Sequence, residues 1–271
     1  MCCLVVGFAA CDDNKDTTIT SNNTQTVNGG NSNGDSSNSN ANSNVSAVSV
    51  FKSGTENGHD YVDLGLTSGT KWATANVGAK TPQDYGNYYA WGEVTTKSTY
   101  NWDTYKYGTY DYDCDYSKLT KYNSTDSKTT LDLSDDAAYA NWGGKWRMPT
   151  DVQWEELSNQ CYWVWTSGYN GSYAKGYIVY KVKSSSDRGK KISKGDAPSS
   201  SYSLSDAHVF LPTAGFRGNG GPFDVLYGIY WSSSLDTGNP DGALNAVFYT
   251  KDVYSIGDSR CYGLSVRAVF K

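Results

Sequence analysis

The chain has 271 residues and a net charge of −5, and it carries 23 Tyr and 9 Trp against 7 Phe. The first fifty residues hold one Lys and four Asp, so the remaining residues are near neutral, at about −2. This charge excludes the basic footprint that binding to nucleic acid or to anionic lipid requires. Residues 51–271 are long enough for one β-rich domain, since such domains often run to roughly 200–250 residues.

The N-terminus begins with a short apolar run over residues 4–10, which is typical of a signal peptide and too short to span a bilayer. The run ends in the letters FAAC, which resemble a lipobox, so we expect a signal peptide over residues 1–10 and lipidation of Cys11. Two acyl chains on one cysteine provide stable membrane anchoring. The alternative is an unstructured tail with an incidental cysteine, because no Lys or Arg precedes the apolar run.

Two acidic residues, Asp12 and Asp13, follow this cysteine and resemble the surface-export signal of Bacteroidetes lipoproteins. They predict a lipid-anchored protein of the outer membrane, exposed at the cell surface; a periplasm-facing anchor is the alternative. The lipidated cysteine and the segment after it, residues 11–50, are expected to form a disordered linker, because Asn, Ser, Thr, Gly and Asp dominate it and cannot bury enough apolar surface. As a flexible coil, residues 12–50 would span roughly 35 Å.

The first half of the domain, residues 51–271, is expected to contain strands, a short helix and an irregular excursion. Short strands are predicted over residues 48–51, 61–66 and 70–78, where apolar and polar side chains alternate or apolar residues gather. Pro82 suits the first position of a short helix over residues 82–93. The aromatic and charged stretch over residues 100–128 is expected to have little regular structure.

Two helices are predicted in the middle of the chain. The first would begin at Ser134 as N-cap and end at Gly143. The second would begin with a capping box between Thr150 and Gln153, and its apolar side chains share one face: Trp154, Leu157 and Cys161.

Strands dominate the rest of the chain. They are predicted over residues 177–182, over a segment that ends at Pro212, and over three runs within the last sixty residues, GIYWSSS, ALNAVFYTKDVYS and LSVRAVFK. Helices in the first part with many short strands late in the chain indicate an α+β domain.

Cysteines and acidic residues provide little metal or redox chemistry. After cleavage before Cys11, only Cys114, Cys161 and Cys261 would follow the anchor, so at most one disulfide forms within the chain. No C-x-x-C motif occurs and only two His are present, so no zinc site is expected. A D-x-D-x-D run could begin a calcium loop, but it lacks the Gly and Glu that such a loop needs, so we interpret it as a solvated acidic loop and expect no cofactor; its residues are Asp111, Asp113 and Asp115.

Five blocks in order resemble the Fibrobacter succinogenes major paralogous domain family, common in Bacteroidetes surface lipoproteins: YVDLGLTSGTKWATANVG, DYGNYYAWGE, DAAYANWGGKWRMPTDVQWEEL, YWSSS and LSVRAVFK. The resemblance covers nearly all of residues 58–271. The family is similar to the C-type-lectin-like fold, which formylglycine-generating enzymes and the variable proteins of diversity-generating retroelements share. The resemblance implies a mixed twisted sheet with two helices, a structural Arg267, and a ligand-binding face built by the C-terminal strands and loops. Three tryptophans are expected to anchor the core: Trp146, Trp154 and Trp231.

The residues between the last scaffold blocks, 216–262, are rich in Tyr, Asn, Asp, Ser and Gly. This composition is typical of evolved paratopes, because Tyr provides rigid contact area and small polar residues adapt. The candidate ligand-binding residues are Asp224, Tyr227, Tyr230, Asp236, Asn239, Asn245, Tyr249, Lys251, Tyr254 and Tyr262.

The favoured hypothesis is a surface lipoprotein that displays an adhesin-like or lectin-like binding domain and is not an enzyme. Its partner would be a host or bacterial surface protein or glycan, and a retroelement-diversified binding protein is one version of it. One alternative is an enzyme of the same fold, formylglycine-generating or acting on glycans, with Cys261 and Asp206 as test residues; the second C-terminal cysteine of those enzymes is absent. His208 is expected to be a packed side chain. Another alternative is a structural or fimbrial assembly lipoprotein.

Overall fold

The computed structural model describes residues 49–109 and 118–271, except residues 220 and 224. Val45–Lys271 form one compact unit, and residues 1–44 belong to a separate unit that lies outside the described residues. Cys11, the linker up to residue 48 and the D-x-D-x-D run also lie outside the described residues. Across the described ranges, no helix combines the length and the apolar character needed to cross a bilayer.

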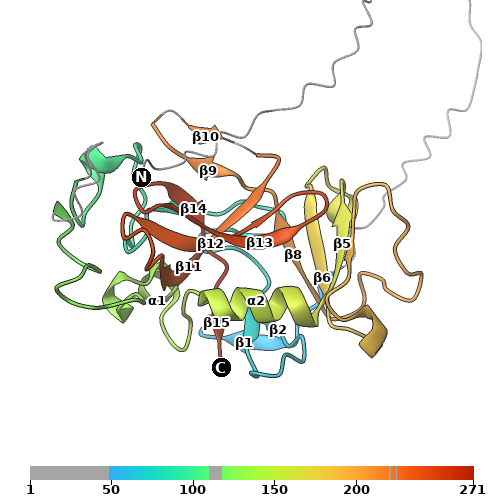
Figure 1. Cartoon of the computed structure of the whole chain (residues 1–271). Coiled ribbons are helices and arrows are strands. Elements are labelled where there is room, and N and C mark those ends of the chain that lie inside the picture. The colour runs from blue at the N-terminus through green and yellow to red at the C-terminus, as the bar shows by residue number, and fades with distance from the viewer. Residues whose placement is uncertain (1–48, 110–117, 220, 224) are drawn as a thin grey trace, which may run out of the picture. The chain divides into compact units, whose positions relative to one another are not determined.

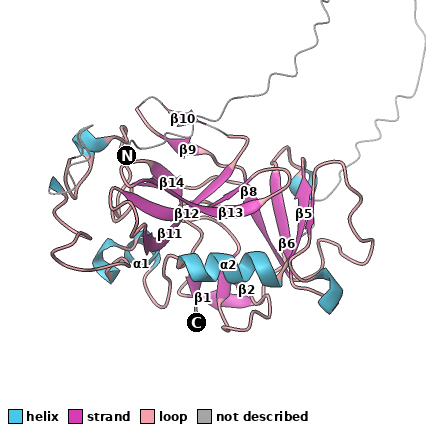
Figure 2. Cartoon of the chain, viewed as in Figure 1, coloured by secondary structure: helices cyan, strands magenta, loops and turns pink. Residues whose placement is uncertain are grey.

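The described residues form a mixed α+β structure made mostly of strands, with two α-helices (Figures 1 and 2). The helices are α1 (Ala137–Trp142) and α2 (Asp151–Gln160). The strands are β1 (Gly54–Glu56), β2 (His59–Val62), β3 (Lys71–Ala73), β4 (Tyr88–Tyr89), β5 (Tyr162–Thr166), β6 (Gly176–Tyr180), β7 (Lys191–Ile192), β8 (His208–Pro212), β9 (Phe216–Arg217), β10 (Pro222–Phe223), β11 (Gly228–Leu235), β12 (Gly242–Phe248), β13 (Val253–Ser259), β14 (Gly263–Ser265) and β15 (Val269–Phe270).

These strands form three sheets within the described part of the chain. The first has the order β1-β2-β3-β15, the second β10-β9-β14-β11-β12-β13 with β4 beside β14, and the third β7-β5-β6-β8. β15 pairs with β3, so the last residues of the domain close a sheet that the first residues begin. β11, β12 and β13 pair antiparallel as a meander, and this part of the second sheet packs against α2 (Figure 1).

Helix α2 has the capping box that the sequence predicts. The Thr150 side chain accepts a hydrogen bond from the backbone N–H of Gln153, and the Gln153 side chain accepts one from the backbone N–H of Thr150. The predicted apolar face is buried, and the Trp154 ring lies 4.7 Å from that of Trp72 and 5.6 Å from that of Tyr230. The helix therefore joins β3 of the first sheet to β11 of the second.

The helix predicted over residues 82–93 does not form. Gly86 has a φ of +73°, and a Cβ there would lie 2.6 Å from the Val77 carbonyl oxygen, so the chain turns sharply at a position only glycine tolerates. The next residues, Tyr88 and Tyr89, form β4 and are buried against β14. Burial of two aromatic rings in a sheet outweighs the local helix-start signal of Pro82.

Three other sequence predictions differ from the structure. The N-cap of α1 is Asp136, whose side chain accepts from the Tyr139 backbone N–H, while Ser134 lies two residues earlier in a 3-10 segment. Residues 49–51 form no strand, and pairing begins at β1 instead. Strand β5 was not anticipated, because its run YWVWT directly follows a helix and has no turn residue before it.

The tryptophans expected in the core are there. Trp146 and Trp231 are fully buried and Trp154 is 3% exposed. The indole N–H of Trp231 donates to the Tyr89 carbonyl and that of Trp154 to the Trp231 carbonyl, so the rings keep their polar atoms satisfied.

The irregular segment before α1 is held to the domain by the buried carboxylate of Asp135. The hydroxyls of Tyr107 and Tyr122 donate to it, and the Lys121 ammonium forms an ion pair with it. These donors lower the pKa of Asp135 to about 2 despite the opposing effect of burial. The guanidinium of Arg260, also buried, donates to the carbonyls of Lys121 and Tyr122 and fixes the same segment to the second sheet.

The buried side chain of Arg267 connects all three sheets. Its guanidinium donates to the carbonyls of Ala73 and Phe210 and to the side-chain oxygen of Asn76, at 2.8–3.1 Å. The Tyr230 hydroxyl donates to the Pro212 carbonyl and accepts from Asn76, which brings the second sheet into the same network. The prediction that Arg267 is structural is consistent with this geometry.

We predict that Arg267→Met lowers the free energy of unfolding by about 3–5 kcal/mol, because it leaves several buried acceptors without donors. Urea unfolding followed by tryptophan fluorescence measures the change. Arg188→Met is the control, since Arg188 is exposed and should change stability by less than about 0.5 kcal/mol. Equal stability of the two variants would contradict a structural role for Arg267.

Candidate functional site

Three of the predicted binding residues come together at one end of the β12–β13 hairpin. The rings of Tyr227 and Tyr249 stack with centroids 4.9 Å apart, beyond the last paired residues of β11 and β12. Tyr254 on β13 pairs in register with Val247 on β12, and burial together with the nearby Tyr227 hydroxyl raises the pKa of Tyr254. We call the surface formed by Tyr227, Tyr249 and Tyr254 the tyrosine face.

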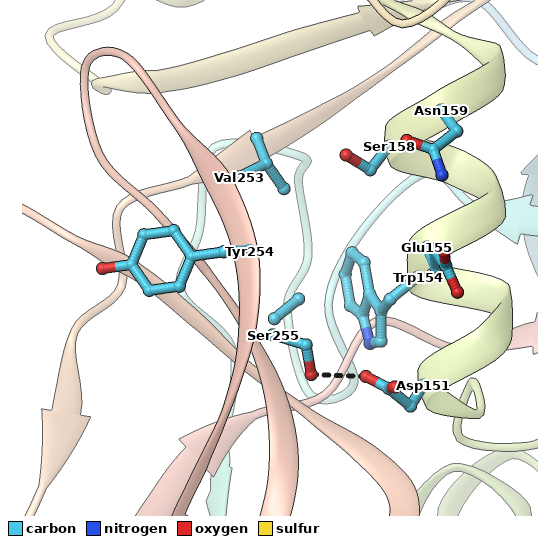
Figure 3. A pocket seen from close by; sticks show the side chains of 9 residues that line it. Asp151, Trp154, Glu155, Ser158, Asn159, Val253, Tyr254 and Ser255 are labelled. Atoms are coloured by element: carbon cyan, nitrogen blue, oxygen red, sulfur yellow. Dashed lines mark hydrogen bonds between the residues drawn. The ribbon is translucent and has the colours of Figure 1, made fainter.

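This face is accessible. Tyr249 is 40% exposed and Tyr254 38% exposed, and Tyr227 is half-buried. Side chains alternate along a strand, so Tyr254 points to the side of β13 opposite to its neighbours Val253 and Ser255, which face α2 (Figure 3). Exposed aromatic rings held rigidly by stacking provide contact area at small entropic cost.

Other residues extend the surface beyond the sequence prediction. Lys251, which was predicted, is exposed in the turn between β12 and β13. Val225 and Leu226, which were not, directly precede Tyr227 and are 42% and 54% exposed. Trp165 of β5 contacts the Tyr249 ring, with centroids 6.4 Å apart. Val225 and Leu226 lie within the segment 216–262 that the sequence assigns to the binding face, but only polar and tyrosine side chains of that segment were candidates.

Two predicted residues belong to the other end of the same strands. The Asp236 carboxylate accepts hydrogen bonds from the backbone N–H groups of Gly238 and Asn239 and from the Asn239 side chain. These bonds shape the turn between β11 and β12. The turn lies one strand length, about 20 Å, from the tyrosine face, so the structure does not bring Asp236 and Asn239 together with it.

The sequence predicts Tyr230 and Asn245 at the binding surface, whereas the structure buries both side chains fully. Tyr230 packs on Phe248 with its ring centroid at 5.9 Å and donates to the Pro212 carbonyl, so it is part of the core network. Asn245 donates to the Asp258 carboxylate at 3.0 Å. Neither side chain reaches a ligand at the surface.

The remaining candidates lie elsewhere. Tyr262 is half-buried and packs on Phe216, with ring centroids 5.2 Å apart, at the start of β14. Asp224 lies outside the described residues. The tyrosine face therefore contains three of the ten predicted residues, with Lys251 in the adjoining turn.

The groups considered for enzyme chemistry are buried or paired. Cys161 and Cys261 are buried free thiols, and burial raises the pKa of Cys261 to about 12, which disfavours the nucleophilic thiolate. His208 is buried between the Tyr169 hydroxyl and the Asp206 carbonyl, as a packed side chain should be. Asp206 forms an ion pair with Lys183 at 2.7 Å. Among the residues described, no three His, Cys, Asp or Glu side chains are grouped to hold a metal ion.

The Asp258 carboxyl lies on the same side of β13 as Tyr254, facing away from α2, and its pKa is raised. Burial raises its pKa to about 6, and the hydrogen bond from Asn245 opposes this only in part. Asn245 keeps its own amide oxygen without a hydrogen-bond partner among the described residues. The charge at this point of the hairpin therefore changes in mildly acidic solution.

Comparisons with known proteins provide no assignment: no family model matches the chain, and neither a curated protein nor a solved structure matches it.

We predict that Asp258→Asn removes a pH dependence of stability. In the native state Asp258 binds its proton more tightly than in the unfolded state, so native stability falls as pH rises from about 4 to 6 and is constant above. The rise of the pKa to about 6 on this largely buried carboxyl corresponds to a loss of up to roughly 3 kcal/mol. Urea unfolding of both proteins at pH 4 and pH 7 measures it; the same fall in the variant would assign it to another group.

Proposed function

We propose that this protein is a surface-exposed lipoprotein whose C-type-lectin-like domain binds a partner through the tyrosine face. The observation that carries the proposal is the stacked pair of Tyr227 and Tyr249 beside the exposed Tyr254. Isolated exposed apolar residues are ordinary, but a group of rigid, partly exposed aromatic rings at a hairpin end is typical of an interaction surface.

The architecture supports the assignment to the C-type-lectin-like fold. An α+β domain with two helices, in which the last strands and their connecting turns carry the exposed rings, is the arrangement the resemblance implies. The partner would be a protein or glycan on a host or bacterial surface, where tyrosines contribute apolar contact and Lys251 a positive charge. A lipid anchor at Cys11 followed by a long polar linker would display the domain away from the membrane.

A binding screen tests this proposal. The mature chain is screened against glycan arrays and against surface proteins of host and bacterial cells, and each hit is measured by biolayer interferometry. We expect Tyr249→Ala to weaken the binding about tenfold or more, because interface tyrosines often contribute about 2 kcal/mol. Tyr173→Ala is the control, since Tyr173 is 98% exposed and lies on a different loop. Equal affinity of the two variants, or no ligand at micromolar concentrations, would refute the proposal.

Lipidation and display are tested separately. We expect metabolic labelling with an alkyne fatty acid to mark the wild-type protein, and protease added to intact cells to remove its domain. Cys11→Ser should lose the label, because no thiol is left for acylation at that position. Cys114→Ser should keep the label as a matched control. Labelling of the Cys11→Ser variant, or full protection from protease on intact cells, would contradict the anchor or the surface location.

A further inference from the structure

A cavity of about 290 Å³ lies between helix α2 and the inner side of the β12–β13 hairpin (Figure 3). Val253, Tyr254 and Ser255 all line it, but the Tyr254 ring points to the other side of β13, so the tyrosine face lies on the opposite side of that strand. Its size is at the lower limit of ligand pockets, which begin at roughly 300 Å³. It therefore suits a small ligand or a single side chain of a larger one.

One wall of the cavity is apolar. It consists of the Trp154 ring, Val253 and Ala246, all on elements that the core holds rigidly. The indole N–H of Trp154 donates to the Trp231 carbonyl, which leaves only its carbon surface for a ligand. An aliphatic stem could pack here with little rearrangement.

The polar wall lies beside Trp154 on the same helix, α2, and is rich in acceptors. Asp151 accepts a hydrogen bond from the Ser255 hydroxyl, and Glu155 stands exposed at the rim. The side chains of Ser158 and Asn159 also line the cavity and make no hydrogen bond with other described residues. A ligand that donates hydrogen bonds fits this wall.

The negative charges of Asp151 and Glu155 are not neutralised by a cationic side chain of the described residues. Asp151 and Glu155 are four residues apart on one helix, and such a like-charge pair destabilises a helix by roughly 0.2–0.5 kcal/mol. Neither forms an ion pair within the described residues. Lys191, near the other end of α2, donates instead to the carbonyls of Ser158 and Gly189.

Structural roles explain only one of the two acids. Asp151 lies in the first turn of α2, where a negative charge is favourable, and it ties β13 to the helix through Ser255. Glu155 has neither role. A like-charge pair that destabilises its helix, beside a cavity and without a compensating contact, is expected at a functional position.

We infer that this cavity binds a small primary amine, with the ammonium group between Asp151 and Glu155 and its carbon stem against Trp154 and Val253. The ammonium supplies the donors and the positive charge that the α2 wall lacks. The same chemistry occurs in an amino sugar and in a lysine side chain.

The test uses n-butylammonium chloride as probe, titrated into the ¹⁵N-labelled mature chain and followed by NMR at the Trp154 indole, which a Trp154→Phe variant assigns. We expect saturable shifts there, and binding about fivefold or more tighter than for n-butanol or butyrate, since these lack the charged donor. Glu155→Gln should weaken amine binding by a similar factor. D-glucosamine and Nα-acetyl-lysine amide, titrated next, indicate a glycan or a protein source by which of them binds more tightly.

The matched control is Glu156→Gln, which removes the same charge one residue later, where Glu156 bonds to Ser68 outside the cavity. It should change amine affinity by less than about twofold, because an exposed charge off the site is screened. Tyr249→Ala should leave amine binding unchanged, so failure of this inference and failure of the tyrosine face are distinguishable. Equal binding of n-butanol and the amine, or equal effects of the two Gln variants, would overturn the inference.

Discussion

The domain depends on a buried positive charge that has no carboxylate partner among the residues the structure describes. Arg267 is fully buried, and desolvation lowers its pKa to about 10, yet it remains charged because carbonyl oxygens and Asn76 accept its N–H groups. Desolvating a guanidinium is costly, so the structure tolerates it only when every donor is satisfied. The requirement fixes β3, β8 and the segment after β14 in one relative position, and through Tyr230 it fixes β11 as well.

The fixed positions of these strands determine which side chains of the β12–β13 hairpin face α2 and which face away from it. Since α2 is held against β3 by Trp154 and Trp72, the inner side of the hairpin must face the helix. Alternation along β13 then directs Val253 and Ser255 into the cavity and Tyr254 away from it. The hairpin thus carries aromatic rings on the side away from α2, while its other side closes a cavity against the acidic residues of α2.

The candidate site shows where sequence reasoning succeeds and where it fails. Tyr230 and Tyr249 both lie in the Tyr-, Asn- and Gly-rich segment 216–262, which the resemblance implies to be ligand-binding. Only one is accessible, because Tyr230 lies under α2 and within reach of the Pro212 carbonyl, whereas Tyr249 follows the last paired residue of β12. The cavity beside Asp151 and Glu155 cannot be read from the sequence, because strand β13, which follows about a hundred residues later in the chain, completes it.

The sequence by itself determined the local features: the capping box of α2, its buried face, most of the late strands, the α+β class, and the polar segment that follows Cys11. These depend on neighbours within a few residues, whose spacing is visible in the letters. Tertiary structure alone decided that residues 88 and 89 form a strand and that Asn245 is buried. It also decided that Tyr227 and Tyr249 from two connections meet Tyr254 of β13 at one hairpin end. Those outcomes depend on contacts between distant segments, which compete with local preference and outweigh it when large aromatic side chains are buried.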